Sequence, residues 1–135
     1  MNEPVIGGDV NQLAVWQKAT EFATALDEMD TELHFGPDKE WLIFLVEQAS
    51  GIVTRSIEEG WRRANVAEIL LSMYDAEGSL AMLAYYIEFL AGEGYLAHDQ
   101  ADRLENMQRE LGELLAQLIG VLRQELQLQT RHIVN

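Results

Sequence analysis

The sequence predicts an all-α protein that folds as an antiparallel, up-down-up-down four-helix bundle. Four segments carry apolar residues at alternating spacings of three and four, which places those residues on one stripe of an α-helix. Short stretches with helix terminators and caps separate the segments. Helices joined by short connections run antiparallel to their neighbours. The bundle is therefore expected over residues 10–128, between a flexible N-terminal tail at 1–9 and a C-terminal tail at 129–135.

The first two helices are expected at about 10–30 and from 38 to about 60. The run 34–38 separates them, because Gly36 and Pro37 terminate helices and Asp38 is a suitable N-cap. The stripe of the first helix is Val15, Ala19, Phe22, Leu26, Met29 and Leu33. The stripe of the second helix is Leu42, Leu45, Ala49, Ile52, Ser56 and Gly60, with Trp41, Phe44, Val53 and Ile57 widening its apolar face. The small residues at 49–51 would permit close contact with another helix.

The third helix is expected from residue 65 to about 92. Asn65 and Glu68 have the spacing of a capping box, although one kinked helix that continues through 60–65 is an alternative. Gly92 and Gly94 end the helix, since glycine adopts the left-handed conformation without steric cost. The stripe is Val66, Ile69, Met73, Ala76, Leu80, Leu83, Ile87 and Leu90.

The fourth helix is expected to open at Asp99, with Asp102 also in its first turn, because negative charge is favourable at a helix N-terminus. Its main stripe is Leu104, Met107, Leu111, Leu114, Leu118 and Val121, and a second stripe beside it is Leu115, Leu122 and Leu126. Residues from about 129 onward show no clear period.

Composition narrows the class of protein and the partners that it fits. The chain of 135 residues is long enough for one core, and it has no cysteine for a disulfide or a thiolate metal site. Neither a secretory signal nor a membrane-spanning segment is evident, so a soluble, cytoplasmic protein is expected. A formal charge of −14 makes nucleic acid and anionic membranes poor partners and makes a basic protein a better electrostatic match.

No pattern of catalytic or metal-binding residues is present, so we expect no enzyme, no metal and no cofactor. Metal sites in four-helix bundles use Glu-x-x-His pairs, and His34, His98 and His132 occur in no such pair. No serine lies in a Gly-x-Ser-x-Gly elbow, and neither glycine pair has the context of a phosphate-binding loop. A metal-dependent enzyme would require ligands that converge only in the folded chain.

The end of the second helix carries the candidate contact residues. Glu59, Trp61, Arg62 and Arg63 follow one another closely, with Arg55 about two turns earlier. Tryptophan and arginine are enriched in binding hot spots, which favours a contact between subunits or with a partner. The alternative is an intramolecular cap, in which the indole covers the end of the bundle. Four aromatic residues beside the main stripes form either the rim of a wide core or an oligomer surface: Trp16, Tyr85, Tyr86 and Phe89.

The order of several short motifs resembles the four-helix bundle proteins encoded in intervening sequences of bacterial large-subunit ribosomal RNA genes, and the related accessory proteins of diversity-generating retroelements. These motifs are residues 13–19, residues 56–60 with Arg63, residues 78–80 and residues 94–96. The resemblance implies an antiparallel bundle that forms a homopentamer and has no known enzymatic activity. For the retroelement group it implies binding to a reverse transcriptase and RNA through a basic surface. This chain has Glu47 and Gln48 where the family tends to have arginine, and Ser56 in place of the usual asparagine.

The sequence is therefore compatible with two functions. The first is a non-catalytic homo-oligomeric interaction or scaffold protein, with a pentamer favoured by the resemblance and a dimer as the fallback. The second is a nucleic-acid-associated accessory protein that recruits a reverse transcriptase or RNA through Arg55, Arg62 and Arg63. A basic patch formed on assembly would distinguish the second from the first.

Overall fold

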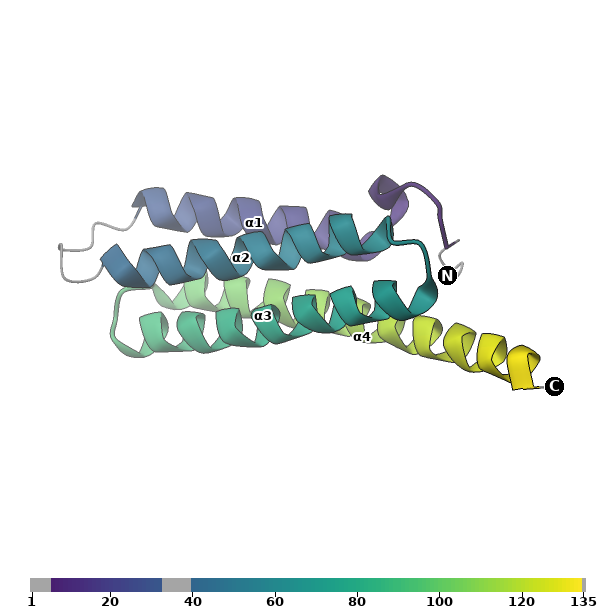
Figure 1. Cartoon of the computed structure of the whole chain (residues 1–135). Helices are drawn as coiled ribbons and strands as arrows, with labels where there is room; N and C mark the ends of the chain where they lie inside the picture. The colour runs from purple at the N-terminus through teal and green to yellow at the C-terminus, as the bar shows by residue number, and fades with distance from the viewer. Residues whose placement is uncertain (1–5, 33–39, 135) are drawn as a thin grey trace.

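The computed structural model describes residues 6–32 and 40–134, and the side chains of 6–30 and 40–131. Over this part of the chain the fold is one short 3₁₀ turn, η1 (Val10–Gln12), followed by α1 (Ala14–Glu32), α2 (Glu40–Trp61), α3 (Val66–Gly92) and α4 (His98–Val134). Each helix packs on its neighbours in the chain, and α1 also packs on α4, so the predicted up-down-up-down bundle is confirmed (Figure 1). No described helix is long and apolar enough to cross a membrane.

The core of the bundle is apolar among the described residues: no polar or charged residue is buried as a whole, although the carboxyl oxygens of the half-buried Asp30 are. All eight residues of the stripe predicted for α3 are buried. The α1 stripe is buried from Val15 to Met29, whereas Leu33 lies outside the described residues. Burial of each large aliphatic side chain contributes about 1.5–3 kcal/mol, so these stripes are the main source of the bundle's stability.

The buried stripe of α2 differs from the predicted one. Only Leu42, Ala49 and Gly60 of the predicted stripe are buried, while Leu45 and Ser56 are half-buried and Ile52 is exposed. The core-facing residues of α2 are Leu42, Val46, Ala49, Val53, Ile57, Gly60 and Trp61. The side of α2 that faces the core is therefore rotated by roughly 60° from the predicted stripe.

The N-terminal segment is more ordered than predicted. The first α-helix begins at Ala14 and not near residue 10, because the 3₁₀ turn η1 precedes it. Asp9 caps this turn by accepting a hydrogen bond from the Asn11 amide at 3.0 Å, and the Gly8 carbonyl accepts one from Trp61. Gly8 and Asp9, which lie within the predicted tail 1–9, thus accept hydrogen bonds from the folded part of the chain. The predicted cap at Asp38 lies outside the described residues.

The connections around α3 follow the local chemistry that the sequence predicts. Asn65 caps α3 by accepting a hydrogen bond from the Glu68 amide at 2.9 Å. Residues 62–65 leave the helical path, so the alternative of one continuous helix is wrong. At the other end, Gly94 has φ +80, and the amide of Tyr95 donates to the Leu90 carbonyl at 2.9 Å. This is the Schellman arrangement that glycine permits.

The fourth helix continues past the predicted end of the bundle. Residues 129–134 were expected to form a tail, but α4 runs to Val134. The last buried residue of α4 is Leu122, and its final turns extend beyond the other helices at the end of the bundle where α2 ends (Figure 1). We call residues 123–134 the α4 overhang.

Candidate functional site

A set of large apolar side chains is exposed on α2 and α3. Three belong to α2 and five to α3: Trp41, Phe44, Ile52, Leu71, Tyr74, Met82, Tyr85 and Phe89. Their exposed fractions run from 38% at Phe89 to 65% at Leu71 and Tyr85. On each helix they recur near spacings of three and four, so each helix has a second apolar stripe outside the core.

The two stripes lie on the outer sides of the adjacent helices α2 and α3, away from the core. Gly60 approaches Ser72 closely, which marks the sides on which α2 and α3 meet. Ile52 precedes Gly60 by two steps of four, and Met82 precedes the buried Leu90 in the same way, so these two residues are the members of the stripes that lie nearest the seam. Residues Glu47, Ser50 and Thr54 of α2 instead face α1. We call the eight exposed residues the α2–α3 apolar face.

Two of the predicted contact residues continue the α2 part of this face. Arg55 and Glu59 follow Ile52 at spacings of three and four, and both are exposed. Arg62 and Arg63 lie in the exposed turn after α2, where their amides donate to the carbonyls of Glu59 and Gly60. The structure therefore places these four charged residues at one end of the α2–α3 apolar face.

Trp61 lies inside the fold of its own chain. Its exposed fraction is 3%, and its indole Nε1 donates a hydrogen bond to the Gly8 carbonyl at 2.8 Å. This geometry corresponds to the intramolecular cap that the sequence left open as an alternative. Trp16 is half-buried, and its Nε1 donates to Oε1 of Glu58 at 2.9 Å, which joins α1 to α2.

Part of the α2–α3 apolar face was not predicted from the sequence. Tyr85 and Phe89 were recognised beside the main stripe, but Leu71, Tyr74 and Met82 were not singled out. The available signal was the apolar character of α3 outside its core stripe. Tyr86, placed in the same aromatic group, is instead half-buried and packs against the core.

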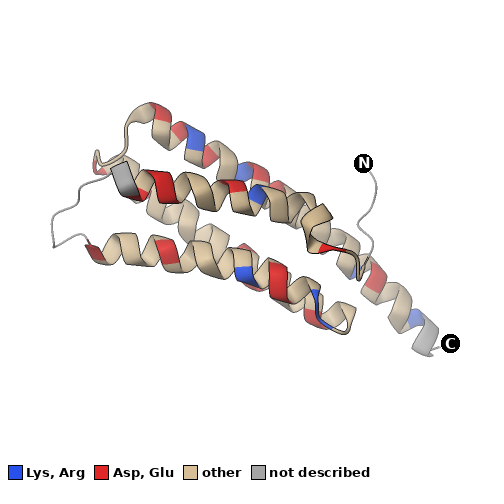
Figure 2. Cartoon of the chain, turned by 90° about the horizontal axis from the view of Figure 1, so that it is seen from above, with Lys and Arg blue, Asp and Glu red and all other residues tan. Residues whose placement is uncertain are grey.

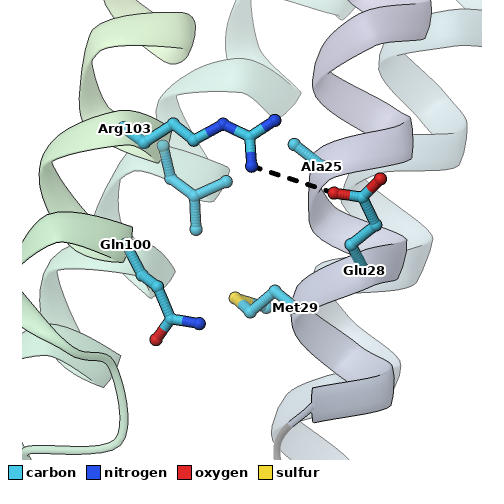
Figure 3. Close-up of a pocket in the computed structure, with 6 residues that line it drawn as sticks. Ala25, Glu28, Met29, Gln100 and Arg103 are labelled. Atoms are coloured by element: carbon cyan, nitrogen blue, oxygen red, sulfur yellow. Dashed lines mark ion pairs between the residues drawn. The ribbon is translucent and has the colours of Figure 1, made fainter.

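A shallow pocket of about 50 Å³ lies between α1 and α4 (Figure 3). Ala25, Glu28 and Met29 line it from α1, and Arg103 of α4 pairs with Glu28 across it at 3.8 Å. A volume near that of one or two water molecules is well below the size of ordinary ligand sites. The ion pair therefore has a structural role between the helices.

A larger crevice of about 210 Å³ lies between α1 and α2. Nine residues line it: Ala23, Leu26, Asp27, Asp30, Val46, Glu47, Ser50, Gly51 and Thr54. Both carboxyl oxygens of Asp30 are buried without a hydrogen-bond donor among the described residues. Burial raises the pKa of Asp30 to about 7, and the neighbouring carboxyl groups of Glu47 and Asp27 raise it in the same direction.

The described side chains contain no cluster of three or more groups suited to hold a metal ion. His98 is exposed at the start of α4, with its Nε2 at 3.7 Å from Asp102. His34 and the side chain of His132 lie outside the described part of the chain. Asp and Glu positions predominate over Lys and Arg along the bundle (Figure 2).

The fold and its surface define a class of protein, an up-and-down helical bundle whose most prominent surface feature is an apolar outer face. The chain belongs to the 23S rRNA-intervening sequence protein family, whose model matches residues 11–117. It is similar in fold to the crystal structure of a protein with unknown function from the S23 ribosomal protein family of Bacteroides thetaiotaomicron. The two share 18% identity with a TM-score of 0.69, over 78% of this chain and 95% of that chain. No curated protein matches the chain.

Proposed function

We propose that this protein is a non-catalytic scaffold that acts as a homo-oligomer through the α2–α3 apolar face. The observation that supports this proposal is the set of eight large apolar side chains left exposed along two adjacent helices. Large contiguous apolar patches on soluble proteins mark interaction sites, because leaving them in water is unfavourable. A core-facing stripe is sufficient for a bundle helix, and α2 and α3 each carry a second one.

A second copy of the chain can cover this face with apolar side chains of its own. Apolar burial has to dominate such a contact, since a formal charge of −14 on each copy opposes association. The flanking Arg55 and Glu59 provide opposite charges that neighbouring copies can pair at the rim. Closed symmetry is the usual outcome for homo-oligomers, and the family resemblance favours a pentamer.

The experiment is light scattering of the purified chain at micromolar concentration with one substitution on the face. Tyr85→Glu replaces a side chain that is 65% exposed, so it should leave the fold intact and reduce the mass to that of the monomer. Ala116→Glu adds the same charge at an exposed position on α4 and should leave the mass unchanged. A monomeric wild type, or a Tyr85→Glu protein with the mass of the wild type, would refute the proposal.

The accessory-protein function, and with it the relation to retroelement accessory proteins, is a second proposal that rests on the exposed Arg62 and Arg63. Glu58, Glu59 and Glu68 lie within a few residues of this pair and reduce its attraction for phosphates. Fluorescence anisotropy with a labelled single-stranded RNA at low salt tests this alternative. Binding that is lost in an Arg62→Glu, Arg63→Glu double variant would favour it over the scaffold.

A further inference from the structure

The α1–α2 crevice brings two carboxyl groups together from different helices. Asp30 lies near the end of α1, and Glu47 lies about two turns into α2. Glu47 lines the same crevice as Asp30 and raises the pKa of the Asp30 carboxyl, and neither oxygen of Asp30 has a hydrogen-bond donor among the described residues. Two carboxylates cannot hydrogen-bond to each other unless one of them carries a proton.

Among the described residues, the charges around this pair do not compensate for it. Asp27 of α1 lines the same crevice and adds a third carboxylate. The nearest cation on α2 is Arg55, which lies beside Gly51 at the exposed edge, and Arg103 of α4 is engaged with Glu28. The hydroxyl of Thr54 donates to the Ser50 carbonyl at 3.3 Å and so is not directed at Asp30. A buried, unpaired carboxylate is costly, and the usual relief is protonation.

We propose that Asp30 and Glu47 share one proton across the crevice, and that release of this proton to solvent loosens α1 from α2. In the protonated pair one carboxyl O–H donates to the other carboxylate, which joins the two helices by a short charge-assisted hydrogen bond. After release, two negative charges face each other beside Asp27, and the crevice opens to admit water. The pair is a pH-sensitive clip between α1 and the rest of the bundle.

The direction of the pH dependence follows from linkage. The pKa of Asp30 is about 7 in the folded chain against an ordinary value of 3.8, so the folded state holds one more proton than the unfolded state between these values. Stability therefore falls as pH rises through this window and levels off above it. Between pH 6 and pH 8 the unfolding equilibrium constant should rise by at most about tenfold from this group, since roughly one proton is released.

The direct test is a carbon-13 NMR titration of the side-chain carboxyl groups of the full chain. The wild type should show a carboxyl titration with an apparent pKa of about 7 at Asp30. In Asp30→Asn the amide replaces the shared proton as the donor, and the carboxyl titration near pH 7 should disappear. An Asp30 carboxyl that titrates below about pH 5 in the wild type would overturn the proposal.

A second measurement separates the clip from general effects of pH. Urea unfolding at about pH 6 and pH 8 should show a loss of stability in the wild type that is absent in Asp30→Asn. Glu113→Gln removes an exposed carboxyl on α4 and should keep the wild-type slope, including any contribution from His98. Should Asp30→Asn fail to fold, Glu47→Gln provides the same donor from α2 and takes its place. Equal pH slopes in the wild type and in these crevice variants would also overturn the proposal.

Discussion

A methyl group added at Gly60 would place its carbon 2.3 Å from the Cβ of Ser72, so α2 and α3 meet here without room for any side chain on the α2 side. The Gly60→Ala protein must therefore separate the two helices locally. We expect a loss of about 1–3 kcal/mol, as for other overpacked cores, measured by urea unfolding. Replacing Ser72 with glycine in the same chain should recover part of the loss.

Gly78→Ala is the matched control for this prediction. Gly78 lies within α3 with no atom close to the position of an added Cβ. Alanine is the better helix former by about 0.5–1 kcal/mol, so this variant should be more stable than the wild type. If both alanine variants move stability in the same direction, steric contact with Ser72 does not explain the effect at Gly60.

Replacing Trp61 should lower the stability of the monomer and not merely weaken assembly. Trp61→Ala removes a side chain that is 3% exposed and leaves the Gly8 carbonyl without its partner, so we expect a loss of about 3–5 kcal/mol. Trp41→Ala, at a position that is 54% exposed, should change monomer stability by less than about 0.5 kcal/mol yet weaken assembly. Unfolding curves and light scattering on both proteins check this contrast, and a stable but dissociated Trp61→Ala protein would contradict it.

Lys18 on α1 should control the titration of Glu110 on α4. The hydrogen bond and positive charge of Lys18 lower the pKa of the Glu110 carboxyl, and the pair joins the two helices. Its contribution to stability is therefore present above the ordinary glutamate pKa and is lost as pH falls through the lowered value. Carbon-13 NMR should show the Glu110 pKa rising in Lys18→Gln. In Glu21→Gln, which removes the other acidic neighbour of Lys18, the depression at Glu110 should persist.

Asn65 should contribute to the stability of the fold only by capping the N-terminus of α3. Asn65→Ala leaves the Glu68 amide without its acceptor, so we expect a loss of about 1 kcal/mol. Asn106→Ala removes an exposed side chain within α4 that bonds only to Arg109 in its own helix, and it should stay within about 0.5 kcal/mol of the wild type. Thermal unfolding followed by circular dichroism measures both. A loss at Asn106 equal to that at Asn65 would argue against capping as the cause.

Local signals were sufficient for the number of helices and for most of their boundaries. The Asn65 cap and the Gly94 turn act within a few residues, so their chemistry can be read directly from the chain. The orientation of α2 could not be obtained in this way. Its predicted and observed stripes share Leu42, Ala49 and Gly60. At most other positions the buried residue is the one that follows the predicted residue in the sequence, because this helix is apolar on both sides. Packing against α1 and α3 decides which side faces the core, and that packing is not local.

The candidate site was predicted only in part for a similar reason. Arg55 and Glu59 stand out as charges near the end of an apolar helix, and they border the exposed face. Trp61 has the composition of a contact residue, but its partner is the carbonyl of Gly8, 53 residues earlier in the chain. A sequence pattern of side chains does not predict a hydrogen bond to a distant backbone atom.

The helix content of this protein should vary with temperature because of the α4 overhang. A helix segment without tertiary contacts persists only by propagation from the packed part, where each added residue gains little over the coil. The overhang is about 12 residues, or roughly 18 Å, and its last half-buried residue is Leu126. Its final turns should therefore fray on warming well before the bundle melts. The ellipticity at 222 nm should then show a shallow, non-cooperative slope ahead of the main transition. A chain that ends at residue 128, which keeps Leu126 packed against the core, should lose that slope while keeping the midpoint.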